Sequence, residues 1–252
     1  IPGHDAHGVR LGGAFLQDVK DGKAGDLGRK VLVIGGGNVA FDVARSALRL
    51  GVPSVLMMCL ESAEEMPALP EEIKEGLEEG LRIRHRLSPK RFVTDGGRLT
   101  GVETIRVERI EFDEFGRIKP VVAAGSSEMI PADTVIFAIG QGPDVEPLQG
   151  CAVALDERGL LRADPVSLKT GVAKLYAGGD ASTGPSTVVQ AMAEGKKAAR
   201  SIAQDLGHPI ADLDVFREVK EVPREEAVEL GRKAGHKTLP RAEVPVAPAQ
   251  ER

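Results

Sequence analysis

The chain has 252 residues, 42% of them apolar, which is enough for one large domain or two modest ones with hydrophobic cores. Its 33 basic and 38 acidic residues give a net charge of −5 without any basic block, which argues against nucleic acid or an anionic membrane as the main partner. The longest apolar stretches, such as Thr134 to Gly140, are far shorter than the roughly 20 residues of a membrane span, and no secretory signal opens the chain. We therefore expect a cytoplasmic protein with no membrane span. Because the chain begins with Ile1 rather than Met, we expect it to be part of a longer protein.

The first elements in chain order form a strand–helix–strand unit. Residues 11–20 predict a short amphipathic helix, and residues 30–34 are a continuous apolar run typical of a buried parallel strand. Residues 38–50 carry apolar side chains at helical spacing, and residues 55–59 predict a second buried strand. Strand, turn, helix and strand within about 30 residues make a βαβ unit.

The turn inside this unit carries the pattern GxGxxA. Gly35 permits a tight turn, Gly37 lets backbone approach a pyrophosphate, and Ala40 keeps the helix close to the strand. The N–H groups at the start of the helix can then meet phosphate charge. The pattern predicts a dinucleotide site, with a plain glycine-rich connector as the alternative. The site comprises Gly35, Gly36, Gly37, Asn38, Val39 and Ala40.

The end of the second strand should select the coenzyme. Glu61 lies there, and a carboxylate can bond the ribose hydroxyls while repelling a 2′-phosphate. No arginine occurs between Arg49 and Arg82 to pair with such a phosphate. The segment therefore favours NAD(H) over NADP(H). The alternative is that Glu61 is a solvated acid in a charged loop.

A β-meander is predicted between parallel strands. Pro70 opens a further helix, after which the period changes from 3.6 towards 2. Residues 91–94, 99–112 and 117–123 predict antiparallel strands. Residues 133–139 return to a continuous apolar strand, so the meander is an insertion.

A second glycine turn follows near residue 178. Residues 159–163 and 175–177 predict strands, and residues 185–206 predict a long helix. The side chains expected to face inward from this helix are Val188, Ala191, Ala198, Ala199 and Ile202. The polar remainder predicts one helix at residues 224–233 and an extended or disordered end at residues 239–252.

The second turn has the form of a flavin-contacting turn. The Asp180 carboxylate, after Gly179, can accept a hydrogen bond from the ribityl chain of a flavin. The helix start at Ser186, Thr187 and Val188 can direct backbone amides at the pyrimidine end of the flavin ring and stabilise negative charge there. The alternative is a strand–turn–helix connector with an N-capping acid.

Four segments in this order resemble the small-subunit family of glutamate synthase, which are NAD(P)H-dependent flavoproteins with two dinucleotide-binding domains. The segments are VLVIGGGNVAFDVAR, EEMPA, ADTVIFAIGQGPD and GVAKLYAGGDASTGPSTVVQAMAEGKKAA. The resemblance runs from residue 1 to about residue 206. It implies an α/β fold: a Rossmann-like NAD(P)-binding domain with an inserted β-meander, joined to the C-terminal part of an FAD-binding domain.

The resemblance also implies roles for individual residues. Gly35, Gly37, Asn38 and Ala40 would hold the nicotinamide dinucleotide, and Gly140 would line its site. FAD would be contacted by Gly179, Asp180, Thr187 and Val188. The expected division is residues 1–26 as a connecting segment from the flavin domain, 27–142 as the NAD(P)-binding domain, 143–207 as the C-terminal part of the FAD-binding domain and 208–252 as a polar tail.

The chain departs from the family pattern in three respects. The GxGxxG that binds the ADP half of FAD would precede Ile1, often after an iron–sulfur portion, and neither is in this sequence. Members that prefer NADPH carry paired arginines where this chain has Leu60 and Glu61, which again favours NADH. The CxxC of thioredoxin-reductase relatives is absent, which argues against disulfide reduction.

These features predict an electron-transfer flavoprotein module. It would pass hydride from NAD(P)H to FAD, and electrons would leave through iron–sulfur centres of a partner subunit or another domain. No catalytic side chain is expected, because the cofactors supply the chemistry. No metal site is expected either, since Cys59 and Cys151 are isolated and His4 and His7 lack a further ligand nearby. The alternatives are a non-catalytic dinucleotide-binding sensor or scaffold and, less favoured, a thiol-dependent reductase.

Overall fold

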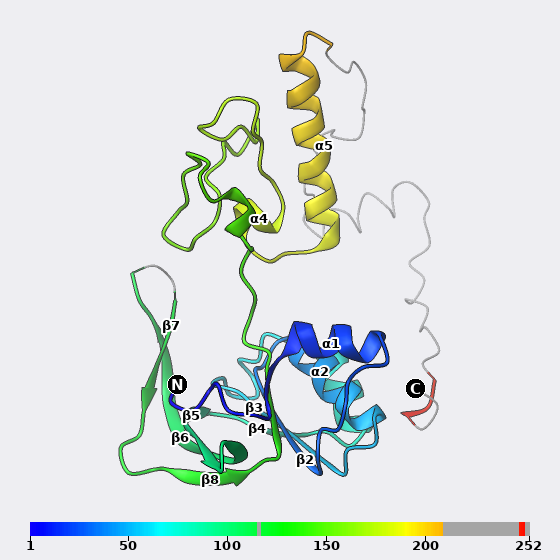
Figure 1. Cartoon of the computed structure of the whole chain (residues 1–252), viewed down its shortest axis with the longest axis vertical. Helices are drawn as coiled ribbons and strands as arrows, with labels where there is room; N and C mark the ends of the chain where they lie inside the picture. The colour runs from blue at the N-terminus through cyan, green and yellow to red at the C-terminus, as the bar shows by residue number, and fades with distance from the viewer. Residues whose placement is uncertain (115–116, 209–246, 250–252) are drawn as a thin grey trace, which may run out of the picture. The chain divides into compact units, whose positions relative to one another are not determined.

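The computed structural model describes residues 1–114, 117–208 and 247–249 (Figure 1). The chain divides into two compact units, the first built mainly from Ile1–Gln141 and the second beginning at Gly142. The predicted helix at residues 224–233 and nearly all of the predicted extended end lie outside the described residues. In the described part, no helix is both long enough and apolar enough to cross a membrane.

A five-stranded parallel sheet forms the centre of the first unit. Its strand order is β1-β9-β2-β3-β4, so β2 and β9 are neighbours although about a hundred residues separate them in the chain. The βαβ prediction is confirmed, since β2, α2 and β3 follow one another and the two strands pair in parallel. The strands are β1 (Val9–Leu11), β2 (Lys30–Ile34), β3 (Ser54–Met58), β4 (Arg82–Arg84) and β9 (Thr134–Phe137).

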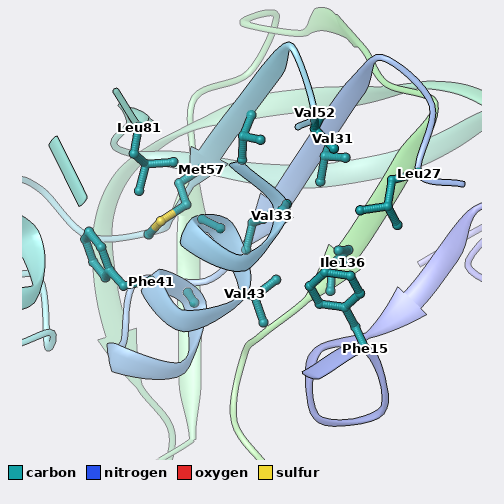
Figure 2. Packing of buried hydrophobic residues seen from close by; sticks show 14 of the residues in the cluster. Phe15, Leu27, Val31, Val33, Phe41, Val43, Val52, Met57, Leu81 and Ile136 are labelled. Carbon is teal, nitrogen blue, oxygen red and sulfur yellow. The ribbon is translucent and has the colours of Figure 1, made fainter. Parts of the chain in front are cut away.

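Helices α1 (Gly12–Lys20), α2 (Asn38–Arg49) and α3 (Pro70–Glu78) contribute to the core on one face of this sheet. Side chains alternate across a strand, so Val31 and Val33 of β2 point to the helices. Figure 2 shows Phe15 of α1 and Val43 of α2 packed with Val33 and Ile136 in this layer. The amphipathic helix expected at residues 11–20 is thus confirmed.

An antiparallel sheet contributes to the core on the other face. Leu32 and Ile34 of β2 and Met58 of β3 pack with Phe92 and Val102 of that sheet. The β-meander insertion is confirmed, and the sequence patterns missed its fourth strand, which pairs with β6. The strands are β5 (Leu87–Asp95), β6 (Arg98–Phe112), β7 (Ile118–Val122) and β8 (Glu128–Pro131).

The segment before α1 is bound to the first unit by backbone hydrogen bonds. The Phe92 N–H donates to the Pro2 carbonyl over 2.9 Å, and the Leu99 N–H donates to the His7 carbonyl over 3.0 Å. Strand β1 then pairs with β9 in the parallel sheet. The first residues therefore join both sheets of this unit.

The second unit contains η1 (Glu146–Leu148), α4 (Asp180–Thr183) and α5 (Val188–Asp205). The strands expected at residues 159–163 and 175–177 are wrong as regular strands, because these segments form only isolated bridges such as Leu155–Leu161 and Lys169–Tyr176. Each bridge joins two nearby loop segments. Within the described part of this unit, no neighbouring strand extends them into a ladder.

The long helix expected at residues 185–206 begins later than predicted. Thr187 caps it, so Pro185 and Ser186 belong to the preceding loop. The expected inward face is also wrong for this chain, since no described residue of α5 is buried and Val188 is 76% exposed. Small and apolar residues at helical spacing predict a face that another layer can cover, and no described element buries it.

Candidate functional site

The turn after β2 is held tightly against the end of β9. Gly35 has φ +146°, and a Cβ at this position would lie 2.3 Å from the carbonyl oxygen of Ala138. Its N–H donates to the Met58 carbonyl of β3 over 2.9 Å. Gly35 is therefore required by backbone conformation and by the close approach of the neighbouring strand.

Gly37 differs from Gly35 in having open space on its Cβ side. A Cβ added there would meet no atom within 4 Å, and its φ of −91° is accessible to any residue. Helix α2 begins at the next residue, so its first N–H groups have no intrahelical acceptor. This combination leaves room and hydrogen-bond donors for an anionic group.

The other turn residues have different surroundings. Ala40 is fully buried in the core, which keeps α2 close to the sheet, whereas Val39 is 45% exposed. The Asn38 side chain accepts a hydrogen bond from the Leu69 N–H over 2.8 Å. Asn38 thus ties the loop before α3 to the start of α2, a contact that the sequence pattern did not indicate.

A cavity of about 270 Å³ opens beside this turn. It gathers the three glycines with Glu61 and Gly140, and Gly140 has φ +104° with open space on its Cβ side. Parallel strands β2 and β9 both end here, and crevices at the carboxyl ends of such strands are where ligands bind in open α/β sheets. Apolar walls that the sequence reasoning missed come from Pro67, Leu87, Ile118 and Ile139.

Glu61 places its carboxylate against the turn. Its Oε2 atom lies 2.9 Å from the position that a Cβ on Gly36 would occupy. Hydrogen bonds from the Glu64 backbone and the Ser62 hydroxyl lower the pKa of Glu64. The Ser62 backbone and hydroxyl likewise lower the pKa of Glu65. The loop after β3 is therefore negatively charged at neutral pH.

The cavity also exposes part of a buried thiol. The Sγ atom of Cys59 lies 3.6 Å from Nδ1 of His85 and 3.6 Å from the carbonyl oxygen of Glu61. Burial, and after it the charge of Glu61, raises the pKa of Cys59 to about 12. A thiol with that pKa stays protonated and is a poor nucleophile.

A second cavity, of about 590 Å³, lies in the second unit around the turn at Gly179 and the start of α5. Gly179 has φ +65°, and its N–H donates to the carboxylate of Glu194. Asp180 accepts the Ser186 N–H over 3.2 Å. Two carboxylates from α4 and α5 therefore hold this loop, and the sequence reasoning identified only Asp180.

The start of α5 presents backbone donors to the same cavity. The Thr187 hydroxyl accepts the Gln190 N–H over 3.2 Å, and the side-chain oxygen of Gln190 accepts the Thr187 N–H. These two hydrogen bonds form a capping box. The N–H groups of Val188 and Val189, which come first in the helix, have no intrahelical acceptor. The structure thus brings together Gly179, Asp180, Ser186, Thr187 and Val188.

Among the described residues, those that line this second cavity include two acids and no lysine or arginine. Carboxylates repel phosphate but accept hydrogen bonds from hydroxyl groups, and helix N–H groups donate to carbonyl oxygens. The cavity accordingly fits the polyol chain and the carbonyl-bearing ring of a flavin better than its diphosphate.

Solved structures with a similar fold include thioredoxin reductases and an FAD-dependent oxidoreductase. The chain superposes on thioredoxin reductase of T. acidophilum with a TM-score of 0.62 and 24% identity, covering 81% of this chain and 59% of that one. An FAD-dependent pyridine nucleotide-disulphide oxidoreductase from Desulfovibrio vulgaris gives a TM-score of 0.54 at 18% identity, covering 81% and 50%. The α/β fold expected from the sequence is confirmed.

The chain belongs to the pyridine nucleotide-disulphide oxidoreductase family, whose model matches residues 1–195. It is 40% identical to the NADP(+)-dependent formate dehydrogenase subunit beta of Moorella thermoacetica, over 76% of this chain and 27% of that protein. It is 37% identical to the glutamate synthase [NADPH] small chain of Escherichia coli, over 69% and 38%. Its identity to the NADPH-Fe(3+) oxidoreductase subunit beta of Geobacter sulfurreducens is 35%, over 75% and 31%.

These relatives confirm the resemblance to the glutamate synthase small chain. The chain spans less than two-fifths of the length of each of the three. Their names specify NADP(+) or NADPH, so they do not support the preference for NAD(H) expected from Glu61.

Proposed function

We propose that this chain binds a nicotinamide dinucleotide in its first unit and part of FAD in its second, as a module of a cytoplasmic electron-transfer flavoprotein. The observation that carries the proposal is the Gly35–Gly37 turn, with one glycine fixed by backbone contact and another open to a ligand. In this proposal residues 27–142 form the coenzyme domain and residues 143–207 the C-terminal part of the flavin domain, with residues 1–26 as the connecting segment from the flavin domain and residues 208–252 as a tail.

The chain's own residues have binding and orienting tasks. The N–H groups at the start of α2 would hold the diphosphate of the coenzyme, and Gly140 leaves room for its nicotinamide half. Asp180 would accept a hydrogen bond from a ribityl hydroxyl group, while the N–H group of Val188 would face a carbonyl oxygen of the flavin ring. The two cofactors supply hydride transfer followed by single-electron steps, so no side chain needs to act as an acid or base.

The electrons would pass to iron–sulfur centres on a partner subunit or another domain. Support for this step comes from the family and from relatives that are named as beta subunits. A sensor or scaffold that binds the coenzyme without turnover remains the alternative, and a flavin-reduction assay in the complete protein separates the two.

We infer that the Glu61 carboxylate contacts the 2′ position of the adenosine ribose and so distinguishes NADH from NADPH. Its carboxylate lies against the turn, and Glu64 and Glu65 add negative charge to the same loop. Coulomb repulsion would then disfavour the 2′-phosphate of NADPH. We therefore expect NADH to bind more tightly, although the relatives' names specify NADP(H).

The Glu61→Arg substitution tests this coenzyme assignment. It replaces a repelling carboxylate by a guanidinium that pairs with phosphate, so the ratio of NADPH to NADH affinity should rise at least about tenfold. The measurement is the Kd of each coenzyme by fluorescence titration, with Glu71→Arg on α3 as the control. An unchanged ratio removes Glu61 from coenzyme selection.

Binding by the full chain tests the proposed function itself. In calorimetric titrations, NADH and NADPH should bind more tightly than free AMP, because only the dinucleotides carry the diphosphate and the nicotinamide. Absence of heat with both dinucleotides would contradict the proposal.

A further inference from the structure

Arg86 lies where the chain passes from β4 to β5, and its backbone contacts two other segments. Its N–H donates to the Glu61 carbonyl over 3.1 Å, and its carbonyl accepts the Val107 N–H of β6 over 2.8 Å. Its φ is +57°, a left-handed conformation that is uncommon for residues other than glycine. Such conformations persist where the surrounding contacts enforce them, often at functional sites.

The Arg86 side chain makes two further connections between the same segments. One guanidinium nitrogen donates to the Glu108 carbonyl of β6 over 2.8 Å. Another pairs with Oε2 of Glu65 over 3.0 Å, and this oxygen also accepts the Ser62 N–H over 3.1 Å. Arg86 therefore attaches the loop after β3, at Glu61 and at Glu65, to the inserted meander.

These contacts fix the part of the loop that carries the Glu61 side chain. The Glu61 carbonyl is bound to Arg86, and its carboxylate lies against Gly36 in the coenzyme cavity. We propose that Arg86 is a positioning residue that holds the Glu61 carboxylate beside the glycine turn and so sets the discrimination between NADH and NADPH. The inference rests on the proposed function and gives the meander a role in coenzyme selection.

The sign of the effect separates positioning from simple electrostatics. If Arg86 acted only through its charge, its removal would weaken binding of the extra phosphate of NADPH. If the Arg86 side chain positions Glu61 by holding the loop at Glu65, its removal loosens the loop and the Glu61 carboxylate moves away from the turn, although the backbone bond from Arg86 to Glu61 remains. NADH then loses the ribose hydrogen bond, and the repulsion of the 2′-phosphate is relieved.

The experiment measures the Kd of NADH and of NADPH for the full chain and three variants by calorimetry. Arg86→Asn removes the guanidinium and tolerates the left-handed backbone, and Arg86→Lys keeps the charge but cannot reach both partners in the same way. The control is Arg84→Asn, since Arg84 makes a comparable exposed ion pair with Glu128 at 2.7 Å.

We expect the ratio of the NADH Kd to the NADPH Kd to rise at least about threefold in Arg86→Asn, to rise less in Arg86→Lys, and to stay constant in Arg84→Asn. Hydrogen exchange of residues 60–66 should also become faster in both Arg86 variants. An unchanged or falling ratio, or unchanged exchange, overturns the inference alone. Failure of the wild-type chain to bind either coenzyme overturns the proposed function and this inference together.

Discussion

The environment of Cys59 bears on whether the protein transfers electrons through cofactors or acts as a thiol-dependent reductase. It is 2% exposed, directly after β3, and burial raises its pKa to about 12. A thiol-dependent reductase needs a thiolate near neutral pH, usually with a second cysteine close by. The environment of Cys59 therefore disfavours the reductase alternative.

Alkylation tests this assignment at the level of single residues. With iodoacetamide at neutral pH, the exposed Cys151 should react first and Cys59 should stay unmodified until the chain unfolds. The thiolate of Cys59 should form only as the pH approaches about 12. Peptide mass spectrometry of the native chain, with Cys151→Ser as the control, reads out both sites. Rapid modification of Cys59 would revive the reductase alternative.

Helices α2 and α3 are joined by a cluster of charged side chains. Arg45 bonds to Glu72 at 2.9 Å, to Glu75 at 2.6 Å and to Glu79 at 2.8 Å, and Arg49 also bonds to Glu79. The hydrogen bond with Glu79 raises the pKa of Arg45. Burial alone would raise the pKa of Glu79, but the bonds from Arg45 and Arg49 outweigh it and lower that pKa.

Glu79→Gln should lower the free energy of unfolding by about 1–3 kcal/mol at neutral pH, because the nearly buried Arg45 then loses one of its charged acceptors. A lowered carboxyl pKa contributes stability above its unfolded value of about 4.5, and this is lost as the pH falls through the folded value. The difference between wild type and variant should therefore shrink in acid.

Urea unfolding at neutral and acidic pH measures this difference. The control is Glu78→Gln, since the contact of Glu78 with Lys74 is exposed and 4.0 Å long. Equal stability of Glu79→Gln and wild type at neutral pH would contradict the role given to the cluster.

Local sequence patterns predicted most elements of the first unit because each signal is short in range. The apolar run of β2, the glycine turn and the spacing in α2 each lie within about a dozen residues, and all match the structure. Gly35 and Ala40 could be assigned because their backbone requirements show in the residue type itself. Strands β1, β4 and β8 were missed, since they are only three, three and four residues long.

The parts that could not be predicted depend on contacts between distant segments. Three hydrogen bonds join residues that lie 15 to 31 positions apart in the chain. They link Leu69 to Asn38, Arg86 to Glu61, and Gly179 to Glu194. No periodicity or motif marks such pairs. The inward face expected for α5 failed for a related reason, because helical spacing predicts an apolar face and does not say which segment covers it.

At the scale of the whole molecule, each unit contributes one candidate site. The first has three layers, with helices on one face of the parallel sheet and the meander on the other, and its cavity lies where β2 and β9 end. The second offers an acidic cavity at the start of α5. In the proposed function, the first cavity binds the coenzyme and the second binds part of FAD.

Two glycine substitutions separate folding from binding at the central turn. Gly35→Ala should destabilise the chain by about 1–3 kcal/mol, because its Cβ would meet the Ala138 carbonyl in a strained conformation. Gly37→Ala should leave the melting temperature unchanged, because its Cβ meets no protein atom within 4 Å.

The most direct test of the account is therefore the affinity of Gly37→Ala for the coenzyme, measured by calorimetry beside the wild-type chain. The added methyl group would occupy the space through which the backbone approaches the diphosphate. We predict that the Kd of the preferred coenzyme rises at least about tenfold at unchanged stability. Equal affinity in the variant and the wild type would contradict the claim that this turn holds the dinucleotide.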